Sequence, residues 1–373
     1  MSTLKRITVI LLLIALILPS AIIPSQAAYA ASNDILREHM LRLLISIEHE
    51  KEFYGLKDVD LSNVTIGKRI PTYSVENQQL VDTNVQIYPI LHEGKLVSMF
   101  FAITLPNGEL YTQLGTELVK PLEPYTQNGG FAIVYDDLGV NVYNGYEIRQ
   151  IAINPMVQRN TNTAVLETGG SQATSALQNT LNNVSISELE ADFTLNIMES
   201  PLAYNSSRAV VSRSLNVPII RQPSGTSICW AIAVTSILNY IYNYNLTYST
   251  IVNQFNNGQD SALAISTVVI NMNSYYNTNY VRSSNTTPSI TTILNSLALE
   301  KPVYGSFRHS GNNYHAIVIR GANSSTRTFS VMNPTPNVNG YTAGTVSSSD
   351  VWTFYCPEGN ATYTLSQHLR YDG

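Results

Sequence analysis

The stretch that decides the fold spans residues 222–243 and reads QPSGTSICWAIAVTSILNYIYN. Its loop of small residues, PSGTS, does not favour a helix, so we predict a helix that begins near Ile228 or Cys229 and ends at about Tyr242. Apolar residues after the cysteine recur at helical spacing and would bury one face of that helix. Cys229 is one of only two cysteines in the chain. It is a nucleophile, half of a disulfide with Cys356, or a small core residue.

The N-terminal thirty residues have the layout of a secretory signal peptide. A basic start is followed by an apolar stretch and then by small residues, and we expect cleavage near Ala30 or Ala31. The alternative is a membrane anchor, but Pro19 and Pro24 interrupt the apolar stretch before it reaches the roughly 20 residues that a span needs. We therefore expect residues 1–30 to be a signal peptide and the mature protein to be secreted into the extracellular medium, with no membrane attachment.

Charge is divided unevenly along the rest of the chain, which is long enough for about two domains. Residues 31–214 contain 12 Lys plus Arg against 21 Asp plus Glu, a balance of −9. Residues 215–373 contain 7 against 5, a balance of +2. This difference predicts two units that attract one another, and neither unit offers the basic face that a nucleic acid would require.

The first unit, residues 31–185, is predicted to be an α+β domain that is mostly β. Residues 33–55 place apolar side chains at helical spacing, with a polar N-cap at the start. Short β-like runs follow to about residue 155, and Asn107-Gly108 between two of them predicts a hairpin turn. The polar segment 156–185 predicts a linker at the end of this unit.

The segment 186–214 is predicted to be a linker or activation segment, and residues 215–373 a second domain. We predict four helices there, at 229–242 and in LTYSTIVNQFNN, ALAISTVVINMNSYY and TPSITTILNSLALE. Thr287 and Pro288 would start the last helix. Strands follow in KPVYGSFR, NYHAIVIRG and TFSVMN. Helices grouped before antiparallel strands indicate an α+β fold.

A nucleophilic cysteine needs surroundings that favour its thiolate, and both a helix N-terminus and an imidazole do so. Cys229 lies at the predicted helix start, whereas Cys356 lies in a strand-like FYC. Of the six histidines, His309 and His315 lie in the second unit away from its end. His315 opens a strand and is the preferred base, while His309 lies in the loop-like RHSGNN and is the competing one.

Two further residues complete the candidate site. If HAIVIRG and TFSVMN pair as a hairpin centred on Ser324, His315 directly faces Asn333, whose side-chain oxygen would orient the imidazole ring. Gln222 would donate a hydrogen bond to a developing oxyanion, together with the backbone N–H of Cys229. Each residue also has a structural reading, as a strand-end histidine, an Asn-Pro turn and an ordinary loop residue. No cluster of His, Cys, Asp and Glu has metal-ligand spacing, so we expect no metal and no cofactor.

Gln222, Cys229-Trp230-Ala231 on a helix, His315 on a strand and Asn333-Pro334 after the next strand resemble the papain-like cysteine peptidases of clan CA. The likeness is to compact secreted bacterial members, such as the staphopains and the CWA-type or C39-like enzymes, and covers roughly residues 218–335. Gln222 precedes Cys229 by seven positions, one more than in papain, and the tryptophan that often follows the asparagine is absent.

The resemblance implies a papain-like catalytic domain, with a helical lobe that carries Cys229 and an antiparallel β lobe that carries His315 and Asn333. It further implies a secreted endopeptidase that acts on protein or peptide substrates. Such an enzyme is made as a zymogen, with residues 31–185 as an intramolecular inhibitor and cleavage between Arg208 and Leu215. The alternatives are a cell-wall peptide amidase or peptide-modifying transferase with the same dyad, an inactive secreted interaction module, and a permanent binding role for the N-terminal domain.

Overall fold

The computed structural model describes residues 33–77, 79–105, 107–126, 129–154, 181, 184–197, 212–283, 286–309, 313–337 and 339–372. The predicted signal peptide, most of the predicted linker and Arg208 lie outside these residues. Within the described ranges, the chain forms no helix with the length and apolar character that crossing a membrane requires. The fold is α+β, as predicted.

The N-terminal region begins with helix α2 (Asn33–Ile47), which continues as the 3₁₀ helix η1 (Glu48–Tyr54). The apolar residues that predicted this helix are buried, except for Ile35, which is 48% exposed. The helical run ends at Gly55, whose φ of 73° is strained for any side chain. A Cβ atom there would lie 2.4 Å from the carbonyl oxygen of Val97, so the close approach of these two segments also requires glycine.

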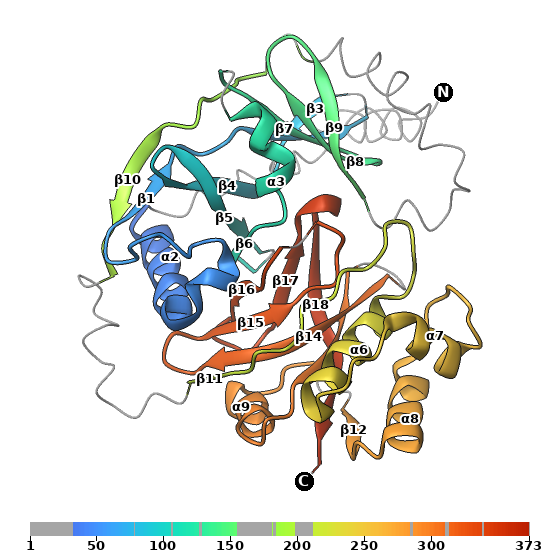
Figure 1. Ribbon diagram of the computed structural model, residues 1–373. Coiled ribbons are helices and arrows are strands. Elements are labelled where there is room, and N and C mark those ends of the chain that lie inside the picture. Colours follow the sequence, from blue (N-terminus) through green and yellow to red (C-terminus); the bar gives the residue numbers. More distant parts are fainter. Residues whose placement is uncertain are drawn as a thin grey trace, which may run out of the picture.

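The described strands form two sheets (Figure 1). The strands of the N-terminal region are β1 (Val64–Gly67), β2 (Thr72–Glu76), β3 (Gln79–Asp82), β4 (Val85–His92), β5 (Lys95–Thr104), β6 (Leu110–Gly115), β7 (Ala132–Asp136), β8 (Gly139–Tyr143) and β9 (Ile148–Ile153). Those that follow are β10 (Ala191–Leu195), β11 (Ser212–Ser214), β12 (Tyr280–Ser283), β13 (Val303–Arg308), β14 (Tyr314–Asn323), β15 (Thr328–Met332), β16 (Thr342–Thr345), β17 (Thr353–Cys356) and β18 (Ala361–Tyr371). Short helical turns are α3 (Val119–Leu122), η2 (Glu123–Tyr125) and η7 (Pro357–Gly359).

The larger sheet runs through both halves of the chain in the order β10-β1-β4-β5-β6-β16-β15-β14-β13-β18-β12, with β11 paired to β14 and β17 paired to β18. The smaller sheet has the order β3-β2-β7-β8-β9. The two regions meet where β6 pairs with β16, with Leu114 opposite Ala343 and Gln113 opposite Gly344. Separating the regions would therefore break a sheet. The boundaries at residues 185 and 215 stay predictions.

The predicted hairpin turn at Asn107-Gly108 is present, and both ends of the predicted activation segment form strands. Gly108 takes a φ of 82° between β5 and β6, and Asn107 Oδ1 accepts a hydrogen bond of 3.1 Å from the N–H of Glu109. In the segment 186–214, β10 pairs with β1 and β11 pairs with β14. Both ends of that segment are thus hydrogen-bonded to the larger sheet.

The C-terminal region places its helices before most of its strands. They are α6 (Cys229–Tyr242), α7 (Tyr248–Asn256), α8 (Ile265–Tyr276) and α9 (Ile290–Ala298), and α6 has the predicted bounds. The predicted start of α9 at Thr287 and Pro288 is wrong, because the hydroxyl of Ser289 caps the helix by accepting a bond of 3.1 Å from the N–H of Thr292. The carbonyl oxygen of Pro288 instead accepts a hydrogen bond of 2.7 Å from Trp352 Nε1.

A buried ion pair also joins the two regions. Arg320 on β14 is fully buried, and its Nη1 and Nη2 atoms donate to the Glu50 carboxylate at 2.7 and 2.9 Å. The guanidinium carbon lies 3.9 Å from the ring centroid of Tyr341, and Nη1 also donates to Ser330 Oγ at 2.9 Å. Helix α2 packs beside this ion pair against β6, β15 and β16, so it contacts strands of both regions.

His39 on α2 makes the fold sensitive to acid. Burial, and next the charge of Arg42, lower the pKa of His39 from 6.5 to about 4. A histidine whose pKa falls on folding stabilises the fold at pH values above its pKa in the unfolded chain. That contribution is lost as the pH falls from 6.5 to 4. We expect His39→Gln to remove up to about 3 kcal/mol of acid destabilisation, measured as the free energy of urea unfolding at pH 4 and 7. An unchanged difference between the two pH values would contradict this assignment.

Candidate active site

Cys229 is the first residue of α6, and 7% of its surface is exposed. The loop before it is fixed by Asp260, whose Oδ1 accepts a hydrogen bond of 2.7 Å from the N–H of Ser227. The first N–H groups of a helix have no partner within the helix, and they favour a negative charge at this end. Helix α6 packs against β14, the strand that carries His315. The thiol therefore lies where a helix N-terminus favours its ionised form.

His315 and Asn333 are hydrogen-bonded, with 2.9 Å between His315 Nε2 and Asn333 Oδ1. His315 is 8% exposed and Asn333 is fully buried. The amide oxygen is an acceptor, so Nε2 donates and Nδ1 is the nitrogen left to face a thiol. Asn333 Nδ2 in turn donates to Thr335 Oγ1 at 2.9 Å, which holds the amide in place. The structure thus brings together the two side chains that the sequence predicts to be neighbours.

The predicted register of this hairpin is nevertheless wrong. The turn is longer than expected, because Asn323 is opposite Thr328 and not opposite Ser325. The ladder also shifts between Ile319 and Gly321, where Arg320 is an extra residue on β14. Beyond that bulge, Val318 is opposite Met332.

This bulge is what sets the histidine and the asparagine on one face of the sheet. Extending the register beyond Met332 puts Asn333 opposite Ile317, two positions from His315, and residues two apart on a strand share a face. Without the extra residue, Asn333 would be opposite Val318. It would then share a face with the even-numbered residues of β14 and not with His315. Asn333 is therefore a diagonal neighbour of His315 and not its direct partner.

Gln222 is anchored next to this pair. Its backbone N–H donates to the carbonyl oxygen of Pro334 at 2.7 Å, and its side-chain Nε2 donates to the carbonyl oxygen of Thr226. The amide nitrogen carries two hydrogens, so one remains for an oxyanion. The residue is 9% exposed and reaches the same cavity as His315.

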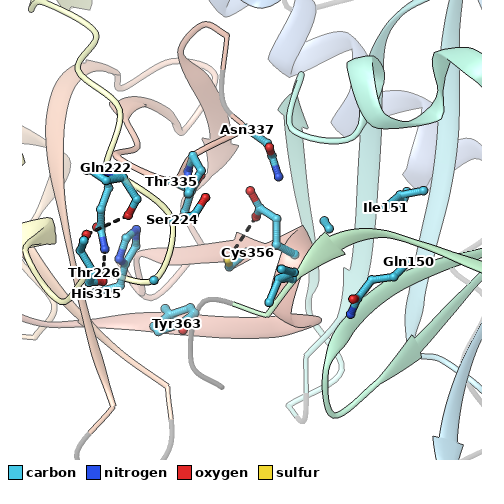
Figure 2. Close-up of a pocket in the computed structure, with 16 residues that line it drawn as sticks. Gln150, Ile151, Gln222, Ser224, Thr226, His315, Thr335, Asn337, Cys356 and Tyr363 are labelled. Atoms are coloured by element: carbon cyan, nitrogen blue, oxygen red, sulfur yellow. Dashed lines mark hydrogen bonds between the residues drawn. The ribbon is translucent and has the colours of Figure 1, made fainter. Parts of the chain in front are cut away.

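The cavity beside His315 has a volume of about 290 Å³, and part of its wall comes from the N-terminal region. Residues Gln150–Ile153 of β9 line it opposite the loop that carries Gln222. Figure 2 shows Gln222, Thr226 and His315 on one side, Gln150 and Ile151 on the other, and Cys356 between them. Strand β9 therefore covers the histidine side of the candidate site.

Cys229 lines a second cavity of about 350 Å³ with Trp230, the residues 262–266 before and at the start of α8, and Arg282. The residues that line the two cavities adjoin in sequence at Thr226 and Ser227 and again at Tyr314 and His315. The candidate dyad thus lies between a cavity covered by β9 and a second cavity lined by α6, α8 and β12.

The competing candidates have other environments. His309 is exposed, and its Nδ1 lies 2.8 Å from the carbonyl oxygen of Thr362. The two cysteines are not joined by a disulfide in the described structure. Cys356 is 2% exposed, its Sγ donates to Glu358 Oε2 at 3.3 Å, and burial raises the pKa of this thiol well above its ordinary value.

Two residues of the site, Thr335 and Glu358, are not predicted from the sequence. Thr335 holds the amide of Asn333, and Glu358 lies in η7 at the wall of the His315 cavity. Asn-Pro-Thr could have indicated the first, since a hydroxyl two residues after an asparagine is a local hydrogen-bond partner. Glu358 has no such signal, because η7 packs against β8 and β9, which are distant in the sequence.

Gln222 offers a test of the oxyanion interaction. We expect Gln222→Glu, which keeps the shape and the bond to Pro334 but removes the donor, to lower kcat about 100-fold with little change in KM. Steady-state kinetics on a peptide substrate would measure the two parameters separately. Ser224→Ala, in the same loop and on the wall of the same cavity, is the matched control and should leave kcat unchanged. A loss confined to KM in the Gln222 variant would contradict the role.

Comparison with known families supports a peptidase. Residues 214–355, which make up less than half of the chain, match the Peptidase_C39 like family. No curated protein matches the chain. No group of three or more metal-ligating side chains is found in the described part of the chain. The family match relates residues 214–355 to the papain-like cysteine peptidases.

Proposed function

We propose that the protein is a secreted cysteine endopeptidase, made as a zymogen, that hydrolyses peptide bonds with Cys229, His315, Asn333 and Gln222. The observation that carries the proposal is the hydrogen bond from His315 Nε2 to Asn333 Oδ1. His315 lies on β14, the strand against which the Cys229 helix packs. That bond orients the ring and leaves Nδ1 for the thiol.

The mechanism follows from the roles of these groups. The thiolate of Cys229 attacks the peptide carbonyl carbon, and the charge that develops on oxygen is stabilised by the N–H of Cys229 and the Gln222 amide. The imidazolium of His315 gives its Nδ1 proton to the leaving amine, and a thioester remains on Cys229. His315 then takes a proton from water, whose oxygen attacks the thioester. The acid product leaves, and the thiolate and imidazolium are restored.

The zymogen part rests on the N-terminal region. Strand β9 forms a wall of the His315 cavity, and a region of balance −9 would dock on one of balance +2. Processing would remove the region by cleavage between residues 208 and 215. Strand β11 pairs with β14, and the N–H of Leu215 donates to the carbonyl oxygen of Arg320 at 2.8 Å. Cleavage before Ser212 would leave this anchored strand on the mature enzyme.

The experiment is to purify the protein from culture medium, sequence its N-terminus and assay it. An N-terminus between residues 205 and 222, with digestion of casein and no release from purified peptidoglycan, would support the proposal. An N-terminus near residue 31 in the active protein would favour a permanent N-terminal domain. Release from peptidoglycan alone would favour an amidase. No activity on either substrate would favour an interaction module.

A further inference from the structure

The cavity that Cys229 lines combines an apolar wall with a single cation. Its volume of about 350 Å³ is that of a small-ligand pocket. Trp230 on α6, together with Leu263 and Ile265 before and at the start of α8, forms the apolar wall. Arg282 on β12 is the one Lys, Arg, Asp or Glu among the described residues that line this cavity. The charge that a ligand meets beside Cys229 is therefore positive.

The polar part of the lining comes from one face of the larger sheet. Arg282 on β12 is opposite Leu369 on β18, and Gln367 on β18 is opposite Ser306 on β13. Directly opposed residues share a face, and so do Gln367 and Leu369, which are two positions apart on one strand. The strands β13, β18 and β12 are neighbours in that order. Arg282, Gln367 and Ser306 thus project from the same face toward the cavity.

Hydrogen bonds fix the opposite wall before any substrate binds. Trp230 Nε1 donates to the carbonyl oxygen of Ser261 at 2.9 Å, and Asp260 Oδ1 accepts from the N–H of Ser227 at 2.7 Å. Both bonds join the loop before α8 to the start of α6. Helix α8 in turn packs against β12, the strand that carries Arg282 (Figure 1). The apolar wall and the cation are therefore held in place on either side of the cavity, which lowers the cost of ordering them around a ligand.

The guanidinium of Arg282 is available to a ligand. Arg282 is exposed and makes no hydrogen bond or ion pair with another described residue. By contrast, Arg320 and Arg327 on β14 and in the turn after it are paired with Glu50 and Asp350. A guanidinium presents its donors as a rigid fork that matches the two oxygens of a carboxylate. A cleft lined by charge of one sign also attracts ligands of the opposite sign.

We propose that Arg282 determines substrate specificity by binding a carboxylate of the peptide in the Cys229 cavity. The carboxylate comes from a glutamate or aspartate side chain or from the C-terminus of a short peptide. The proposal rests on the proposed peptidase function and names the substrates of that site. The apolar wall packs against the methylene groups of the bound residue, and the side chains of Gln367 and Ser306 provide further donors for its oxygens.

This carboxylate site does not require removal of the N-terminal region. All described residues that line the Cys229 cavity lie between Ser227 and Gln367, whereas Gln150–Ile153 of β9 line only the cavity beside His315. The unprocessed chain therefore presents the same cation to a peptide, and binding can be measured separately from hydrolysis.

Hydrolysis of matched peptides tests the specificity. Quenched fluorogenic peptides of alanine and leucine would carry one glutamate, moved through each position, and each peptide would have a partner with glutamine there. At one position the active protein should show about fivefold higher kcat/KM for the glutamate peptide, the upper end for an exposed ion pair. Arg282→Gln should lower this ratio to about 1, and Arg282→Glu should invert it. Peptides that end in a carboxylate or an amide repeat the comparison for the C-terminus and distinguish the two sources.

Arg370→Gln is the matched control. Arg370 on β18 is opposite Val281 and so lies on the other face of the sheet from Arg282, with a side chain that is 44% exposed. This variant makes the same change in net charge and should keep the fivefold ratio. A ratio of 1 at every position and at the C-terminus in the parent would overturn the proposal. So would an unchanged ratio in Arg282→Gln or an equal loss of the ratio in Arg370→Gln.

Binding to the full chain with Cys229→Ala separates this proposal from the proposed function. Nuclear magnetic resonance titration with the same peptides should give about fivefold tighter binding of the carboxylate peptide, and Arg282→Gln should abolish the difference. If the active protein hydrolyses no peptide but this difference is observed, the peptidase function fails and the carboxylate site remains. Hydrolysis without the preference would overturn the carboxylate site and leave the peptidase function. Absence of binding to any carboxylate peptide would also overturn the site.

Discussion

Replacing Cys229 with alanine is expected to lower kcat/KM on a peptide substrate by about 10⁴-fold or more. The variant lacks the nucleophile, so no acyl-enzyme forms. His315→Ala should cause a similar loss, because the thiol then has neither a base nor a cation to stabilise its thiolate. The double variant should lose little more than either single one, since the two residues act as a unit. Hydrolysis of a fluorogenic peptide measures all three, with circular dichroism to verify folding.

His309 provides the matched control for this series. It is the other histidine of the C-terminal unit considered as a base, but it is exposed and its Nδ1 contacts the carbonyl oxygen of Thr362 and not Asn333. His309→Ala should therefore keep the activity of the parent. Loss of activity in this variant together with retention in His315→Ala would show that the base has been assigned to the wrong histidine.

Removing the partner of the buried Arg320 is expected to have the largest effect on stability. Glu50→Ala leaves a fully buried guanidinium without its carboxylate, which costs about 3–5 kcal/mol in comparable buried pairs. The Glu50 side chain is 26% exposed, so we expect a value near 3 kcal/mol. The free energy of unfolding of the full chain in urea, measured with Cys229→Ala to prevent self-processing, gives the number.

An exposed ion pair of the same region serves as the control. Arg213 and Glu300 lie 3.0 Å apart with side chains 44% and 68% exposed, and Glu300→Ala should cost less than about 1 kcal/mol. Arg320→Met, which removes the buried charge, should be less destabilising than Glu50→Ala. Equal costs for Glu50→Ala and Glu300→Ala would contradict a buried pair that holds the two regions together.

The local features of the fold could be predicted from the sequence. A loop of small residues followed by apolar side chains at helical spacing predicts α6 at its observed bounds, because both signals lie within the segment itself. The same holds for α2, where one of the six apolar positions, Ile35, is exposed. The helix α9 starts two residues later than predicted, since Pro288 is held outside the helix by Trp352, 64 residues away.

The contacts that depend on distant segments could not be predicted. The bulge at Arg320 sets the register of His315 and Asn333, and the partner of that arginine, Glu50, lies 270 positions earlier. The pairing of β6 with β16 joins strand edges more than 200 residues apart, and no short-range pattern encodes it. Glu358 could not be predicted for the same reason, because η7 packs against the distant strands β8 and β9.

The role of Cys229 as the nucleophile is tested most directly by labelling with an epoxysuccinyl inhibitor, mapped to individual residues by mass spectrometry. Cys229 should be modified in the active protein. Cys356 should not be, since its Sγ donates to the Glu358 carboxylate, whose negative charge disfavours a thiolate. Labelling of Cys229 should be lost in His315→Ala and kept in His309→Ala. Labelling of Cys229 that is independent of His315, or an intact disulfide between Cys229 and Cys356 in the active secreted form, would contradict this role.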